Sequence, residues 1–136
     1  MDFVKFSLSG FDEFLAYAGL AIVLVYAFMI AYMCITPYDE LKLIKDGNVA
    51  AALSLSGSVL GFSLPLASAI VHSVHPWDMM LWAAIALVVQ LLVYVAVRFT
   101  LLNVTRRIPD GQVASGIVLA AISVAAGVLN AACMTY

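Results

Sequence analysis

Four long apolar stretches, separated by short polar ones, divide the chain. They cover about residues 14–35, 49–71, 77–102 and 113–134. A helix that crosses a bilayer needs roughly 20 mainly apolar residues, so each stretch is long enough to span a membrane. The pattern therefore predicts an all-α integral membrane protein with four transmembrane helices, which form a single membrane domain over residues 1–136.

The polar segments between these spans carry signals for helix ends. Thr36 precedes Pro37, and a residue before proline disfavours helical geometry, so the first span should end there. The second span should begin at Asp46-Gly47-Asn48, because Asp and Asn side chains accept hydrogen bonds from free amides of a first turn. The charged segment between them, YDELKLIKDG, suits either a solvated loop or a short amphipathic turn with Leu41 and Ile44 toward the membrane.

The second span carries a line of small, polar or helix-bending residues. Steps of four and three give this set, called here the second-span stripe: Gly47, Ala51, Ser54, Ser58, Gly61, Pro65, Ser68 and His72. A period of about 3.5 residues places the stripe on one face of one helix. That face should meet other protein, or water, inside the bilayer.

The fourth span has a comparable line of small and polar residues, which ends in an amide: Gly116, Ala120, Ser123, Gly127 and Asn130. The start of this span, DGQVAS, echoes DGNVAA at the start of the second span. We therefore predict two tandem copies of a two-helix unit, over about residues 11–74 and 75–136. A two-helix unit returns to its starting side, so the copies should be parallel rather than inverted.

Composition supports the membrane assignment and removes several classes of function. The chain is 65% hydrophobic and 10% charged, whereas soluble domains are about a quarter charged. No room remains for a catalytic domain outside the membrane. The net charge of −2 gives no indication of nucleic-acid binding.

The sequence shows no catalytic motif, phosphate-binding loop or Cys/His metal motif, so we expect no enzyme, no cofactor and no metal. His72, His75 and Asp78 are the one cluster with potential metal or proton chemistry. A zinc site would need further protein ligands from elsewhere, which favours interfacial histidines without a ligand.

Positive residues predict the orientation, because they concentrate in cytoplasmic loops. Lys42, Lys45, Arg106 and Arg107 lie in loops 36–48 and 103–112, whereas Lys5 is on the other side. Both loops should therefore be cytoplasmic and both termini periplasmic.

The polar residues within the spans allow two readings. Gln90 and Asn130 are amides that suit hydrogen bonds between helices. In the first reading the second-span stripe is a packing surface, within the chain or in an oligomer. In the second it lines a hydrophilic path, and Pro65 frees a backbone carbonyl near Gly61. No Asp, Glu or Lys lies deep in a span, which argues against a proton- or sodium-coupled transporter. The residues expected to pack helices or to line a path are Ser54, Ser58, Gly61, Pro65, Ser68, His72, Gln90 and Asn130.

Three parts of the sequence resemble the YjfL-like family of small bacterial inner-membrane proteins, whose domain has no known function. They are TPYDELKLIKDGNVAAALSLSGSVLGFSLPLASAIVHS, the region around Gln90, and the ending VLNAACMTY. The resemblance implies a bacterial inner membrane and a duplicated two-helix unit. It also implies association with envelope-stress systems and with ATP-grasp proteins, and it supplies no catalytic residues.

The sequence thus predicts a small inner-membrane protein that acts as an oligomerising scaffold or partner subunit, without catalysis. Its expected partners are membrane lipids, further copies of itself, and envelope-stress or ATP-grasp proteins. The alternative is an oligomeric channel, a conduit for small solutes or ions that is lined by the second span.

Overall fold

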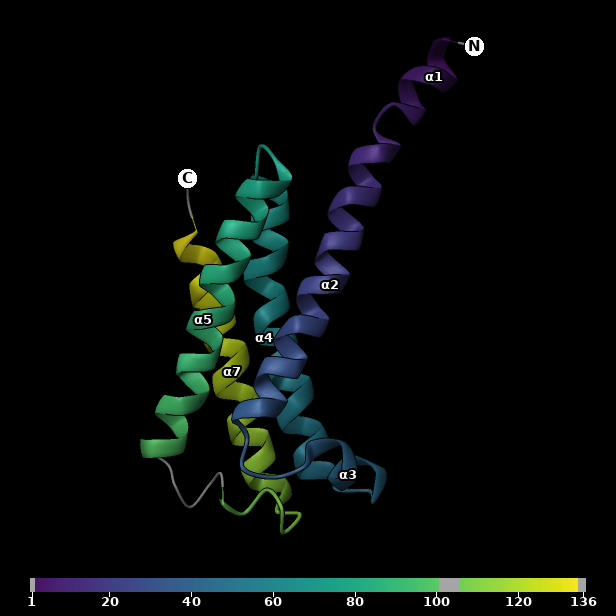
Figure 1. The fold of residues 1–136 in the computed structure, drawn as a ribbon. Helices are drawn as coiled ribbons and strands as arrows, with labels where there is room; N and C mark the ends of the chain where they lie inside the picture. The colour runs from purple at the N-terminus through teal and green to yellow at the C-terminus, as the bar shows by residue number, and fades with distance from the viewer. Residues whose placement is uncertain (1, 101–105, 135–136) are drawn as a thin grey trace.

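The computed structural model describes residues 2–100 and 106–134, and in these ranges every regular element is a helix (Figure 1). Four of the helices are long and apolar enough to cross a membrane, which confirms the predicted fold class. Residues 101 and 102, the expected end of the third span, lie outside the described residues. The helices are α1 (Asp2–Leu8), α2 (Phe11–Ile35), α3 (Glu40–Lys45), α4 (Val49–His72), α5 (Pro76–Thr100) and α7 (Val113–Cys133).

The N-terminal segment forms a helix that the sequence analysis did not predict. Helix α1 continues the direction of α2 beyond the rest of the bundle (Figure 1). Helix α2 itself begins at Phe11 rather than at residue 14, so it takes in Asp12 and Glu13. Two carboxylates in a first turn stabilise a helix N-terminus through the helix dipole, which accounts for the earlier start.

Helices α4 and α7 form the centre of the bundle and run in parallel, side by side (Figure 1). Their backbones approach so closely that the contact needs glycine. A Cβ atom added to Gly57 would overlap Ala120, and one added to Gly61 would overlap the Ser123 carbonyl. One added to Gly127 would overlap the backbone of Gly61. The second-span stripe and the small residues of the fourth span therefore face each other within one chain.

The same glycine turn precedes each of these two helices. Gly47 has φ 84° and Gly111 has φ 79°, in the left-handed region that glycine adopts without strain. The N–H of each glycine donates to the carbonyl three residues earlier, Ile44 or Ile108, at 3.0 Å. This equal geometry agrees with the predicted duplication, which stays a prediction.

Asn48 joins the two turns. Its Oδ1 accepts from the N–H of Ala51 at 3.0 Å, which caps α4 as predicted. Its Nδ2 donates to the carbonyls of Ile108 and Pro109, at 3.0 and 3.2 Å. Gln112, at the equivalent position before α7, makes no side-chain cap. The two helix starts are thus held at the same end of the molecule.

Helix α2 contacts the bundle along much of its length, and its fully buried residues lie in its C-terminal third. Its buried residues are Phe28 and Tyr32. The ring of Phe28 stacks on Phe62 of α4 at 4.7 Å, and the ring of Tyr32 meets Tyr94 of α5 edge to face at 5.1 Å. Nearer its N-terminus, α2 still meets the end of α4, where Ser73 Oγ donates to Tyr17 Oη at 3.4 Å.

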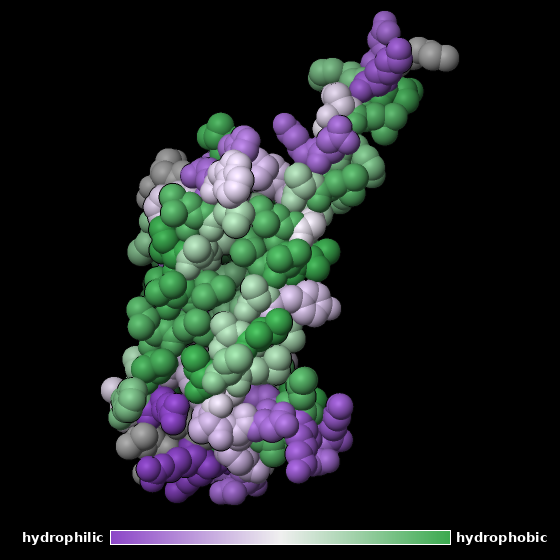
Figure 2. Space-filling model, viewed as in Figure 1, coloured by the Kyte–Doolittle hydropathy of each residue, from purple (hydrophilic) through white to green (hydrophobic). Residues whose placement is uncertain are grey.

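The surface of the molecule has the layout of a membrane protein. Figure 2 shows a broad apolar belt across the visible face of the bundle, with hydrophilic residues collected at both of its ends. One of these ends holds α3 and the 106–112 turn, and the other holds α1 and the connection between α4 and α5 (Figure 1). This distribution matches a bundle whose long helices cross the hydrocarbon layer.

The glycine contact between α4 and α7 predicts a sharp difference between two glycine substitutions. Gly61→Ala should lower the free energy of unfolding by about 1–3 kcal/mol, because its methyl group overlaps Ser123 and Gln90. In the monomeric chain, Gly19→Ala on α2 has nothing within 4 Å of the new atom, and it should be neutral or stabilise by up to about 1 kcal/mol through helix propensity. SDS-driven unfolding of the two variants in detergent micelles measures the difference. Equal loss of stability in both would contradict the packing shown here.

Candidate functional site

Four of the predicted residues lie where α4 packs against the neighbouring helices. Ser54, Ser58, Gly61 and Pro65 are buried. Two of them make side-chain hydrogen bonds, each to a different helix: Ser54 to α2 and Ser58 to α7. Helices α2 and α7 therefore cover the stripe in the region of Ser54 and Ser58.

Gln90 lies at the meeting point of α4, α5 and α7. Its Nε2 donates to the carbonyl of Ser123 at 2.9 Å, and it lies against Gly61. Ser58 Oγ is 3.4 Å from Ser123 Oγ. The structure thus brings Ser58, Gly61 and Gln90 together around Ser123, at the closest approach of the helices.

The carbonyl of Gly61 loses its helical donor because Pro65, four residues later, has no N–H. The backbone of Gly127 lies directly against this carbonyl. A Cα–H group in this position makes a weak hydrogen bond to oxygen. Helix α7 therefore occupies the place where an ion or water would have to reach the carbonyl.

The remaining predicted residues lie toward the end of the bundle that holds the termini. Ser68 is partly buried, and its Oγ is 3.5 Å from the Ala131 carbonyl and 3.4 Å from His72 Nδ1. His72 is exposed, with Nδ1 also 2.9 Å from the Ser68 carbonyl. Asn130 is partly exposed, and its Nδ2 is buried without a partner among the described residues.

His75 and Asp78 accept backbone hydrogen bonds at the start of α5. His75 Nδ1 accepts from the N–H of Trp77 at 3.2 Å, and Asp78 accepts from the N–H of Val74 at 3.4 Å. No group of three His, Cys, Asp or Glu side chains suited to a metal occurs among residues 2–100 and 106–134.

At the other end of the bundle the structure reveals a polar cluster that the sequence analysis missed. Its members come from α2, the 36–39 linker, α3, α4 and α5, and we call it the tyrosine cluster: Tyr32, Thr36, Tyr38, Glu40, Ser54 and Tyr94. Tyr32 Oη is 2.6 Å from Ser54 Oγ, a short hydrogen bond between α2 and α4.

Helix α3 places Glu40 in this cluster. The predicted amphipathic turn exists, but its inner face differs from the expected one: Leu41 is exposed, whereas Leu43 and Ile44 pack on the core. Glu40 stands three and four residues before these two, so it shares their face. That spacing was the available signal, and the high charge of the segment hid it by suggesting a solvated surface.

Burial dominates the electrostatics of Glu40, which is 1% exposed. It raises the pKa of the Glu40 carboxyl from 4.5 to about 8, against the smaller lowering effects of the neighbouring Thr36 and Tyr32 hydroxyls. Burial also raises the pKa of Tyr38. No Lys, Arg or His acts on the pKa of Glu40 among the described residues. The carboxyl thus lies in a phenol-rich site, and Arg98, a cation that acts on the cluster, acts on Tyr94 rather than on Glu40.

The sequence matches the family described as Domain of Unknown Function (DUF350) over residues 6–134. It is 40% identical over 123 residues to the UPF0719 inner membrane protein YjfL of Escherichia coli strain K12. The aligned stretch covers 90% of this chain and 93% of that protein. The protein of the same name from Escherichia coli O157:H7 matches with the same figures. No solved structure matches the chain.

The tyrosine cluster predicts a measurable coupling between Tyr32 and Ser54. Tyr32→Phe and Ser54→Ala should each destabilise the protein by about 1–3 kcal/mol, because each leaves a buried hydroxyl without its partner. The double variant should lose less than the sum, with a coupling energy of about 1 kcal/mol. Ser63→Ala on α4 is the control, since its hydroxyl donates within its own helix, to the Val59 carbonyl at 2.8 Å, and should show no coupling to Tyr32. Additive effects of the two main substitutions, measured by SDS-driven unfolding, would contradict the assignment.

Proposed function

Because this chain belongs to the DUF350 family of unknown function, we propose that it is a multi-pass inner-membrane protein that acts as an oligomerising scaffold or partner subunit. The proposal includes no catalytic step. The family description and the names of the relatives mention no activity.

The observation that carries the proposal is the outer face of α2. Gly19, Ile22, Val23, Tyr26 and Ile30 recur at helical spacing, and all are exposed. A Cβ atom added at Gly19 would meet nothing within 4 Å. Small residues on a membrane helix allow a second helix to approach closely, so this face suits a further chain.

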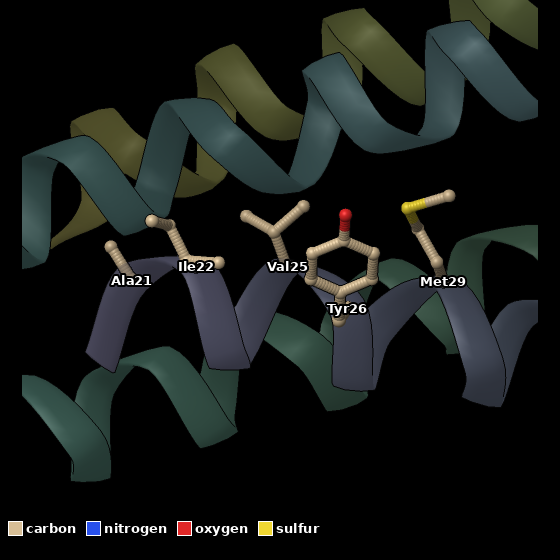
Figure 3. A pocket seen from close by; sticks show the side chains of 5 residues that line it. All are labelled: Ala21, Ile22, Val25, Tyr26 and Met29. Atoms are coloured by element: carbon tan, nitrogen blue, oxygen red, sulfur yellow. The ribbon is translucent and has the colours of Figure 1, made fainter. Parts of the chain in front are cut away.

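Tyr26 strengthens this argument by its depth. It lies three residues from the middle of α2, about 5 Å along the axis, well inside a hydrocarbon layer about 30 Å thick. Tyr26 is 61% exposed, and it lines a groove of about 520 Å³ with Ala21, Ile22, Val25 and Met29 (Figure 3). A hydroxyl in contact with lipid tails lacks a hydrogen-bond partner, whereas a second protein chain offers one.

The alternative, an oligomeric conduit lined by α4, has less support. Ser54 and Ser58 are 0% and 2% exposed, and Gly57 and Gly61 are covered by α7. A path along this face would require α7 to separate from α4. The close fit of the two helices instead supports a packing role for the second-span stripe.

The end of the bundle with α3 supplies a surface for a partner protein. Lys42, Lys45, Arg106 and Arg107 are exposed there. In the proposed orientation this end is cytoplasmic, and the cations suit an acidic partner. Association with envelope-stress or ATP-grasp proteins belongs to this part of the proposal.

Disulfide trapping tests whether α2 meets a second copy. Cys34 and Cys133 are free and exposed, so both are first replaced by alanine. Ile22→Cys in that background should form a disulfide-linked dimer when membranes are oxidised. Val88→Cys on α5 is the control, because it lies at a comparable position along its helix and is similarly exposed, 53% against 59% for Ile22.

A dimer from Val88→Cys alone, or from both variants equally, would move the interface away from α2 and contradict this assignment. Solute flux through liposomes that contain the purified protein would favour the conduit instead.

Alkaline phosphatase fused after Tyr136 tests the orientation. The enzyme is active in the periplasm, so the fusion should be active if both termini lie there. A green fluorescent protein fused at the same point should be dark, since it folds poorly when exported unfolded. Fluorescence without phosphatase activity would reverse the proposed topology.

A further inference from the structure

Glu40 and two phenols form a buried site in which neighbouring hydroxyls influence the carboxyl but none meets hydrogen-bond geometry with it. Neither carboxyl oxygen of Glu40 has a hydrogen-bond partner in the described part of the chain. The hydroxyls of Tyr38 and Tyr94 are buried without a partner there as well. Tyr94 is 1% exposed, like Glu40, and both tyrosines interact electrostatically with the carboxyl. The three side chains thus present polar atoms to one another in a dry environment.

The neighbouring elements bring hydroxyls and little charge to this site. Helix α2 and its C-cap contribute Tyr32 and Thr36, and α4 contributes Ser54. On α5, Arg98 directs Nη1 to the Ile35 carbonyl at 3.4 Å and does not act on Glu40. The charged neighbours on its own segment, Asp39, Lys42 and Lys45, are exposed.

An ionised carboxylate is costly in such surroundings. Removing an ion from water without a countercharge is strongly unfavourable, and a buried group normally responds by becoming neutral. A carboxylate is neutralised by forming one O–H bond to a proton that is taken up from the bulk solvent. The resulting carboxylic acid has a donor for a phenol oxygen and still accepts from the other phenol.

We propose that Glu40 is a proton-binding site that holds helix α3 against the bundle, and that loss of the proton releases the helix. Helix α3 has six residues, too few to stay helical in water without support. Leu43 and Ile44 pack on the core in the docked state, so release exposes them.

The direction of the pH dependence follows from the raised pKa. Below about 4.5 the carboxyl is protonated whether α3 is docked or free, so its contribution is constant. Between about 4.5 and about 8 the docked state keeps a proton that the free state has lost, so docking weakens as pH rises. Above about 8 both states are ionised and docking is weakest.

Thiol labelling of the full chain in lipid vesicles tests the release. Ile44→Cys is placed in the background without Cys34 and Cys133 and compared with Leu41→Cys on the same helix. Leu41 is already exposed, so the ratio of the two labelling rates removes the pH dependence of the thiol itself. The ratio should rise by up to about tenfold per pH unit between about pH 5 and pH 8 and then level off. A ratio that is constant over this range would overturn the proposal.

Two further variants separate proton binding from simple packing. Glu40→Gln keeps the shape of the neutral acid, so Ile44→Cys should stay protected at every pH. Thr36→Val removes a hydroxyl that lowers the pKa of Glu40, so the midpoint should move to higher pH. Release of α3 in Glu40→Gln at all pH values, or an unchanged midpoint in folded Thr36→Val, would contradict the proposal.

Infrared spectroscopy supplies a readout that does not depend on labelling. The wild-type protein should show the carbonyl band of a protonated carboxylic acid at neutral pH, and Glu40→Gln should lack it. Should Glu40→Gln fail to fold, the titration of this band in the wild type and in Thr36→Val still decides. Absence of the band at neutral pH would overturn proton binding. Loss of the band as the Na⁺ or K⁺ concentration is raised would do so too, because a cation would then bind the carboxylate in place of the proton.

Discussion

Gly61 and Gly127 allow the backbones of α4 and α7 to touch, and the arrangement of the other helices follows from that contact. Lipid tails are as apolar as the side chains they surround, so burial alone does not draw membrane helices together. Close packing and buried hydrogen bonds remain as the sources of cohesion. The absence of side chains at Gly57, Gly61, Gly116 and Gly127 brings the two helices within this range along much of their length. The bond from Gln90 to the Ser123 carbonyl then fastens α5 to the same region.

This central contact determines what the second-span stripe can do. A row of serines on one helix face is equally compatible with a wet path and with a dry interface. Once α7 occupies that face, Ser58 pairs with Ser123 and the Gly61 carbonyl is covered by Gly127. The buried hydroxyls of the stripe, Ser54 and Ser58, thus lie in contacts between helices, whereas His72 remains exposed. The outer face of α2 and the end of the bundle that carries α3 take no part in this contact and remain exposed.

The sequence predicts some levels of this structure well and others poorly. The four spans follow from length and apolar content alone, and the Asn48 cap follows from a local hydrogen bond. The helix that packs on the second-span stripe does not follow from the sequence. To match the stripe with the small residues of the fourth span, one must know how each helix is rotated about its axis. Glu40 was missed for a related reason. Its inward direction depends on the face that α3 presents to the core, and a six-residue helix has too few apolar positions to define that face. Helix α1 has only seven residues, none of them buried, and it was not predicted from the sequence either.

Tyr32 connects the helix with the proposed contact face, α2, to the proposed proton site at Glu40. This residue is one of two buried positions of α2, the other being Phe28, so it supplies much of the attachment between α2 and the bundle. It also belongs to the tyrosine cluster, where its hydroxyl bonds to Ser54 and influences Glu40. An ionised Glu40 that draws water into the cluster would compete for that hydroxyl and weaken the hold on α2. The helix with the proposed contact face is thus attached to the bundle at the point where the proposed proton site lies. The proposed release of α3 would therefore also disturb the cluster in which Tyr32 holds α2, so a change of charge at Glu40 would act on both helices.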